Sequence, residues 1–234
     1  MWNGKRKAIT FSYDDGVLQD RRLIKILDKY GLRATFNINS ELLAKPGVLV
    51  RGGISVAHCK WRHEEVARIY LPHEVAVHTL THPLLPSIED DSEVIRQVEE
   101  DRKNLGQLTG QNIVGMAYPG GGVNHDLGVA NLIRANTGVK YARTTVCTGT
   151  FALPEDMLLL NPTAFHLDFD TLYTLADAFF ADTSEEPLLF YIWGHSYEFD
   201  IDDTWEQFEE FCAYIANHDD VFYGTNREVL IDNI

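Results

Sequence analysis

Hydrophobic residues follow two different periods at the start of the chain. From Ile9 to Tyr13 every second residue is apolar, which predicts a strand with one buried face. In residues 18–31, Leu and Ile recur at helical spacing and Gly31 follows them, which predicts a helix that ends at a glycine C-cap. The chain therefore begins with a strand followed by a helix.

The same succession of strand and helix continues to the end of the sequence. Further strands are predicted over residues 33–39, 139–145, 187–195 and 221–225. A short strand is predicted within residues 73–83, and a strand followed by a loop over residues 112–122. Further helices are predicted over residues 92–110, 125–136, 169–182 and 203–217, with a short one closing the chain. Residues 45–63 have little periodicity and predict an insertion loop.

Strands that alternate with helices indicate parallel βα units, which close into a barrel or form a doubly wound sheet. A chain of 234 residues with 45% hydrophobic content has enough apolar side chains for a sizeable core. We expect one α/β domain over residues 1–234.

The charge of the chain narrows the choice of partners. Its formal net charge is −15, and the 20 basic residues are scattered. This balance argues against nucleic acid and anionic membranes, and it favours a neutral or cationic small substrate, while the oligomeric state stays open. No apolar run approaches the roughly 18 residues that span a bilayer. Because the N-terminus lacks the apolar core of a signal peptide, we expect a cytoplasmic protein.

The cysteines point to no metal site. Cys59, Cys147 and Cys212 are widely spaced and contain no CxxC pair. Their number and spacing argue against a disulfide framework and against a thiolate zinc site. They are expected to be thiols in a reducing compartment.

Polar residues gather where the predicted strands end. In parallel βα folds the reactive groups lie at the carboxyl ends of the strands, because the βα loops share one rim. In chain order, these ends carry Asp14 and Asp15, Asn37 and Asn39, His78 and His82, Tyr118 to Gly121, Arg143 and His195. The predicted rim therefore holds a carboxylate pair, a histidine pair and a third histidine.

The motif "HTLTH" places His78 and His82 four residues apart. This spacing brings both rings to one side of a helical turn and suits two metal ligands. Pro83 disfavours helical geometry at His82, so the turn is expected to end there. A carboxylate on the same rim would complete a metal site.

Each of these residues also has a structural alternative. Asp14 and Asp15 are favoured N-cap residues for the helix that follows, although both cannot make the same capping bond. His78 and His82 are compatible with hydrogen-bonded core histidines. Arg143 is compatible with an ordinary surface ion pair.

The sequence "PGGG" at residues 119–122 is compatible with a flexible loop or with backbone N–H groups that bind an oxyanion. It lacks the GxGxxG spacing of a dinucleotide site. The remaining histidines are expected to be structural or on the surface; they are His58, His63, His73, His125, His166 and His218.

In order, the motifs "TFSYDDG", "HTLTHP", "YPGG" and "WGH" resemble those of the polysaccharide deacetylase family, from about residue 7 to residue 196. The resemblance implies the NodB-homology fold, a distorted (β/α) barrel with about seven parallel strands. It also implies hydrolysis of N- or O-acetyl groups on sugars.

Transferred motif by motif, the resemblance assigns a role to five residues. It implies that Asp15, His78 and His82 bind a divalent metal, with zinc as the default and cobalt, nickel, iron or manganese as alternatives. It implies that Asp14 is the general base. It implies that His195, the last residue of "WGH", is the general acid.

The chain also departs from the family pattern. The arginine that often precedes the third motif's proline by two positions, and orients the base, is replaced by Ala117. Arg143 is our candidate to replace it, and Tyr118 is a candidate to supply an oxyanion N–H. The aspartate that tunes the acid histidine is not recognisable, which leaves Asp168 or Asp170 for that role.

The sequence thus predicts a metal-dependent hydrolase that removes acetyl groups from a small acetylated carbohydrate, a mono- or oligosaccharide. One alternative is an amidase or esterase that acts on a non-sugar small molecule. Another is a non-catalytic carbohydrate-binding module, against which the intact set of five residues argues.

Overall fold

A parallel sheet with β1 at its centre organises the fold. The computed structural model describes all residues from 1 to 234. The strands are β1 (Lys7–Asp14), β2 (Ala34–Ile38), β3 (Val48–Arg51), β4 (Ile54–Ala57), β5 (Glu74–Val77), β6 (Gly115–Ala117), β7 (Tyr141–Arg143), β8 (Ala164–Phe165), β9 (Leu188–Gly194) and β10 (Val221–Tyr223). The helices are α1 (Asp20–Lys29), α2 (Val66–Tyr70), α3 (Asp91–Thr109), α4 (Leu127–Asn136), α5 (Phe169–Ala181), α6 (Glu198–Asp202) and α7 (Trp205–Ile215), and a last turn spans Glu228–Asp232.

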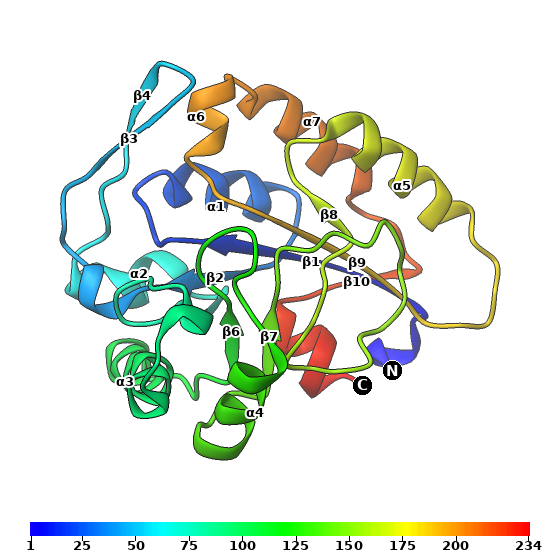
Figure 1. Ribbon diagram of the computed structural model, residues 1–234. Helices are drawn as coiled ribbons and strands as arrows, with labels where there is room; N and C mark the ends of the chain where they lie inside the picture. The colour runs from blue at the N-terminus through cyan, green and yellow to red at the C-terminus, as the bar shows by residue number, and fades with distance from the viewer.

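The strands of the main sheet follow the order β7, β6, β5, β2, β1, β9 and β8, and β10 pairs with β1. All of these pairs are parallel. No ladder joins β7 to β8, so the sheet curls without closing, and the helices lie outside it (Figure 1). The prediction of a distorted (β/α) barrel is confirmed.

Three neighbours hold β1 in place. Strand β9 pairs with it from Lys7 to Tyr13. On the other edge β10 pairs with the first half of β1 and β2 with the second half, which ends at Asp14. The strand that delivers Asp14 is therefore fixed on both edges.

The prediction that β1 is half-buried is wrong, because all eight of its residues are buried. Its side chains Ile9, Phe11 and Tyr13 join the main core under the helices. Its polar side chains are buried too and are hydrogen-bonded: Thr10 donates to Asn226 at 2.9 Å, and Ser12 accepts from Arg143 at 3.1 Å. The alternation of apolar and polar residues therefore distinguishes an apolar buried face from a polar buried face.

The predicted insertion loop at residues 45–63 contains an antiparallel hairpin, β3–β4. Arg51 pairs with Ile54, so the turn consists of Gly52 and Gly53, both with positive φ (59° and 83°). Two-residue hairpin turns of this kind favour glycine because L side chains resist positive φ. Figure 1 shows the hairpin projecting beside α6.

The short strand β8 was not expected from the sequence. It lies in the stretch rich in Pro and Thr and pairs with β9. None of the helices is both long and apolar enough to cross a membrane.

Candidate active site

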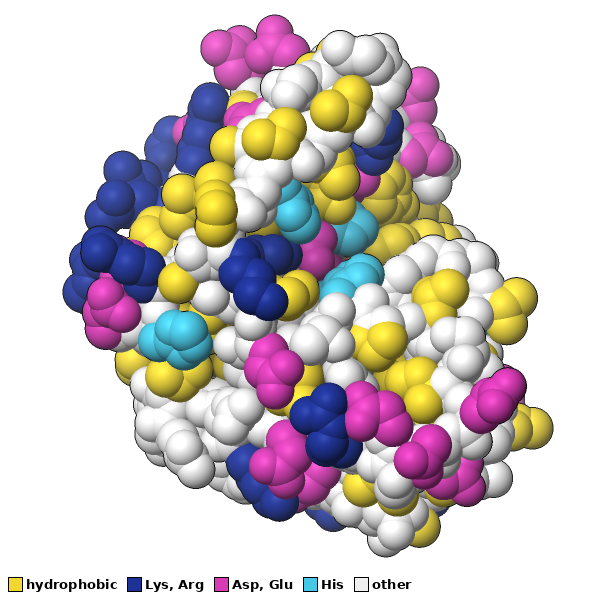
Figure 2. All heavy atoms as spheres, turned by 60° about the vertical axis from the view of Figure 1, so that its left-hand side comes forward, with side chains coloured by type: hydrophobic (Ala, Val, Ile, Leu, Met, Phe, Trp, Pro, Cys, Tyr) yellow, Lys and Arg dark blue, Asp and Glu magenta, His cyan; other side chains and the backbone are white.

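Five of the predicted site residues surround one cavity at the carboxyl ends of the strands. It has a volume of about 260 Å³, and its lining includes Asp14, Asp15, His78, His82 and His195. Figure 2 shows histidines grouped around an acidic side chain at the hollow in this face. Gly120 and Gly121 of the "PGGG" loop also line the cavity.

The backbone after β1 explains how two adjacent carboxylates reach the same cavity. Successive residues of a regular strand point to opposite faces. Asp15 instead has φ of 81° and Gly16 has φ of 63°, so the chain turns sharply after Asp14. A Cβ at position 16 would lie 3.0 Å from Ile38 Cγ2, which leaves little room for any residue but glycine.

The hairpin segment holds Asp15 in this strained conformation. Lys60 Nζ donates to the Asp15 backbone carbonyl at 2.6 Å and lies 3.4 Å from Oδ1. His58 Nε2 lies 3.2 Å from Asp15 Oδ2. Burial alone would raise the pKa of Asp15, but the His58 hydrogen bond and the Lys60 charge hold that pKa well below its usual range.

Asp15, His78 and His82 form a set of donors that fits a divalent ion. One ligand atom from each lies within 4.8 Å of the others. His78 Nδ1 is 2.8 Å from the Ala117 carbonyl, so it carries the proton and the lone pair is on Nε2. That Nε2 atom is buried without a hydrogen-bond partner. Burial lowers the pKa of His78 to about 4, which keeps the ring neutral as a metal ligand must be.

The predicted helical turn between the two histidines is wrong. Thr79 and His82 both have positive φ (66° and 64°). The Thr79 hydroxyl accepts the N–H of His82 at 3.1 Å and closes the turn. The two rings still lie next to each other, edge to face, with centroids 4.9 Å apart.

Arg143 forms a buried ion pair with Asp14. Its Nη2 lies 2.5 Å from both carboxylate oxygens, and its guanidinium stacks on Trp193 at 4.5 Å. Asn37 donates to Asp14 Oδ1 at 2.8 Å. Burial would raise the pKa of Asp14, but the Arg143 charge holds that pKa below its usual range, so the carboxylate stays ionised. The guanidinium beside Asp14 thus comes from the end of β7. The position on β6 where the family pattern often has an arginine is occupied by Ala117.

His195 is paired with a carboxylate that the sequence analysis missed. Its Nδ1 lies 3.0 Å from Glu198 Oε2, and its Nε2 lies 3.9 Å from Asp14 Oδ2. Burial would lower the pKa of His195, but the hydrogen bond and charge of Glu198 raise it to about 9. His166 Nε2 and Arg51 Nη1 also bind Glu198, at 2.9 and 2.7 Å. Burial would raise the pKa of Glu198, but the hydrogen bonds and charges of His166 and His195 hold that pKa far below its usual range.

Three predicted residues do not reach the reacting centre. Tyr118 donates its N–H to the Arg143 carbonyl and its hydroxyl to the Leu158 carbonyl, both at 2.9 Å, so neither group is free for a substrate. Asp168 caps α5 by accepting the N–H of Thr171. Neither Asp168 nor Asp170 contacts His195, whose partner is Glu198.

The structure adds four residues to those predicted: His58, Lys60, His166 and Glu198. His58 and His166 were expected to be structural or on the surface. Glu198 follows His195 by three residues, a spacing that places both on one turn, so the "HSYE" pattern was a usable signal. His58, Lys60 and His166 carried none, because only tertiary folding brings them close.

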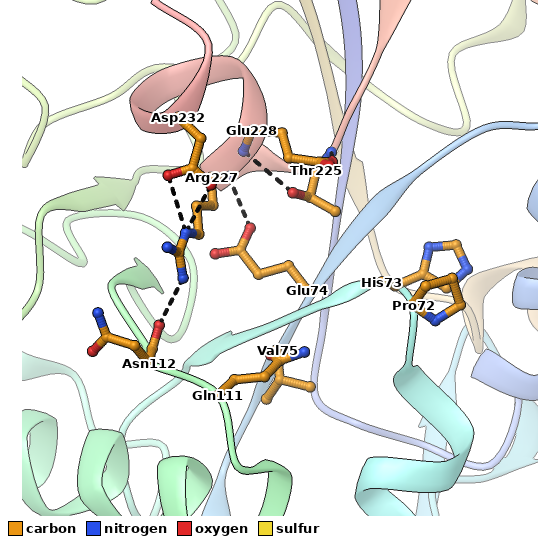
Figure 3. A pocket seen from close by; sticks show the side chains of 10 residues that line it. All are labelled: Pro72, His73, Glu74, Val75, Gln111, Asn112, Thr225, Arg227, Glu228 and Asp232. Carbon is orange, nitrogen blue, oxygen red and sulfur yellow. Dashed lines mark hydrogen bonds and ion pairs between the residues drawn. The ribbon is translucent and has the colours of Figure 1, made fainter.

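A separate hollow of about 270 Å³ lies between the start of β5 and the last turn of the chain (Figure 3). Both oxygens of Glu74 there accept hydrogen bonds, from Thr35, Tyr141 and the N–H of Arg227. Arg227 is paired with Asp232. These contacts tie the last turn of the chain to the start of β5.

Comparisons with known proteins agree with the fold. A family model described as polysaccharide deacetylase matches residues 3–142, which is more than half of the chain. No curated protein matches the sequence.

Several solved structures share the fold. Puue allantoinase superposes with a TM-score of 0.70 at 14% identity, over 97% of this chain and 90% of that one. A family 4 carbohydrate esterase from Streptomyces lividans, in complex with acetate, superposes with a TM-score of 0.56 at 12% identity, over 94% of this chain and 92% of that one. The Streptococcus pyogenes deacetylase PplD, in complex with acetate, superposes with a TM-score of 0.51 at 20% identity. That match covers 64% of this chain and only 61% of the PplD chain. Identities this low show the fold alone.

Proposed function

The chain belongs to the polysaccharide deacetylase family, and we propose that it is a metal-dependent hydrolase that removes N- or O-linked acetyl groups from a carbohydrate. One observation carries the proposal. Around a single cavity, an ionised carboxylate, Asp14, faces a histidine with a raised pKa, His195, beside three converging metal donors. An acid and a base with opposed pKa shifts in one cavity are the requirement for acid–base hydrolysis.

Asp14 and His195 divide the proton transfers between them. Asp14, held ionised by Arg143, accepts the proton of the attacking water. His195 is protonated at neutral pH and donates a proton to the leaving amine or alkoxide. Glu198 keeps the His195 ring in place and stabilises its positive charge.

Asp15, His78 and His82 would hold a divalent ion, which when bound lowers the pKa of water and polarises the substrate carbonyl. Zinc is the first ion to test, and two histidines with one carboxylate also accept cobalt, nickel, iron or manganese. His58 and Lys60 orient the Asp15 carboxylate behind this donor set.

The substrate that we propose is a mono- or oligosaccharide. The cavity of about 260 Å³ is just below the usual range of small-molecule sites, which supports a small substrate. A larger sugar would extend beyond this cavity.

The test is acetate release from a panel of N- and O-acetylated sugars, measured with metal-loaded and chelator-stripped protein whose metal content is determined in the same samples. Release that disappears with the metal and returns with zinc or cobalt would support the proposal and identify the bond. Bound metal without acetate release would favour an amidase or esterase acting on a non-sugar molecule. Absence of metal binding would favour the non-catalytic binding module.

A further inference from the structure

A second cavity, of about 390 Å³, adjoins the catalytic one. The two share Asp15, His82 and Tyr197 as lining residues. The rest of the second cavity comes from residues 42–60, which lead into and out of the hairpin β3–β4. A substrate whose acetyl group lies in the catalytic cavity therefore has this space next to it.

The charges that line the second cavity do not cancel. Its charged lining residues are one acidic residue, Asp15, and two basic residues, Lys45 and Lys60. Lys60 pairs with Asp15 at 3.4 Å, which leaves Lys45 as the unbalanced charge. Lys45 is exposed and has no ion-pair partner in the chain. The cavity is thus locally positive in a protein whose net charge is −15.

The same cavity offers an additional donor and an apolar wall. The Tyr197 hydroxyl makes no hydrogen bond within the chain, and burial raises the pKa of Tyr197, so the group stays a donor. Leu42, Pro46 and Leu49 line the cavity as well. Free cationic and hydroxyl donors next to apolar side chains suit an anion carried on a partly apolar ring.

We propose that this cavity is a subsite for an anionic substituent, a carboxylate or a phosphate, on the acetylated sugar, and that Lys45 determines this specificity. The inference rests on the proposed function and refines its substrate class. It reverses the expectation of a neutral or cationic substrate, which was based on net charge alone. The local charge decides what this cavity binds, because screening confines each charge to about 10 Å at ordinary ionic strength.

The test compares three substrates: N-acetylglucosamine, its 6-phosphate, and N-acetylmuramic acid, which carries a carboxylate. Acetate release gives kcat/KM for each with the wild type, with Lys45→Gln and with Lys140→Gln. Lys140 is also exposed and without an ion pair but lies outside both cavities, which makes Lys140→Gln the matched control.

We expect the wild type and Lys140→Gln to prefer at least one anionic sugar by about tenfold, the value of one charge-assisted hydrogen bond. In Lys45→Gln this preference should disappear, so that kcat/KM for the anionic sugar falls by about tenfold relative to that for the neutral sugar. The preferred anionic sugar identifies the substituent as carboxylate or phosphate. Equal rates on all three sugars, or a preference that survives Lys45→Gln, would overturn the subsite.

If no acetate is released from any sugar, the proposed function fails, and calorimetric binding of the same three sugars decides the subsite separately. Binding of an anionic sugar that is about tenfold tighter than that of the neutral one, and is lost in Lys45→Gln only, supports it. Equal or absent binding overturns it.

Discussion

Replacement of Glu198 by glutamine tests the role of His195 as the acid. Glutamine keeps the shape of the side chain and removes the charge that His195 Nδ1 contacts at 3.0 Å. The pKa of His195, raised to about 9 mainly by Glu198 against the opposing effect of burial, should then fall toward the ordinary histidine value of about 6.5. The raised pKa favours the protonated ring, so His195 of the variant loses its proton at a lower pH than His195 of the wild type.

The size of the effect follows from the two pKa values. At pH 8 a group with a pKa of about 9 is roughly 90% protonated, and one with a pKa of about 6.5 is roughly 3% protonated. We therefore expect kcat/KM of the variant to be about 30-fold lower at pH 8. At pH 5.5 both groups are mostly protonated, and the rates should be similar.

The assay is kcat/KM for acetate release between pH 5 and pH 10, with Asp202→Asn as the control. Asp202 binds the same arginine as Glu198, Arg51, at 3.0 Å but does not contact His195. The basic limb should move by about 2.5 pH units in Glu198→Gln only. A basic limb that stays in place in Glu198→Gln would refute the assignment of His195 as the acid.

Two further predictions concern the site, and a third concerns Glu74 at the start of β5. Asp14→Asn should lower kcat by at least about 100-fold with unchanged metal content by elemental analysis; retained turnover would remove Asp14 as the base. His82→Ala should lose metal in equilibrium dialysis against zinc, because Asp15 and His78 alone leave too few donors, and full retention would contradict the donor set. Burial raises the pKa of Glu74 to about 7, so its stabilising contribution is complete below its ordinary pKa and declines as pH rises through 7. In urea unfolding, the free energy of the wild type should therefore fall by roughly 3 kcal/mol more from pH 5 to pH 8 than that of Glu74→Gln, and equal slopes would contradict this.

The sequence was sufficient for residues whose position depends on local structure. Asp14, Asp15, His78 and His195 each lie at or directly after the end of a strand, and parallel strands bring their carboxyl ends to one rim. The period of the apolar residues located these strands, so these side chains could be placed together before any contact was known.

The sequence was insufficient where a contact depends on segments that are distant along the chain. Lys60 and His58 reach Asp15 only because the hairpin segment folds back over β1. Tyr118 follows its strand as expected, yet the pairing of β6 with β7 uses its N–H. The polar face of β1 is buried because other side chains of the protein hydrogen-bond to it. Alternation alone cannot distinguish a polar face of this kind from one that faces solvent.

The base of the hairpin is closed by the His58 N–H, which donates to the Gly47 carbonyl at 2.8 Å. Residues 48–57 are therefore a hairpin whose two ends are joined by a hydrogen bond, so another loop could be grafted at this position to alter the substrate range. Arg51 lies in this hairpin and donates to Glu198, the partner of His195. A graft that replaces Arg51 would therefore also remove one of the bonds that hold the carboxylate behind the proposed acid, so the hairpin cannot be exchanged without a change at the catalytic cavity.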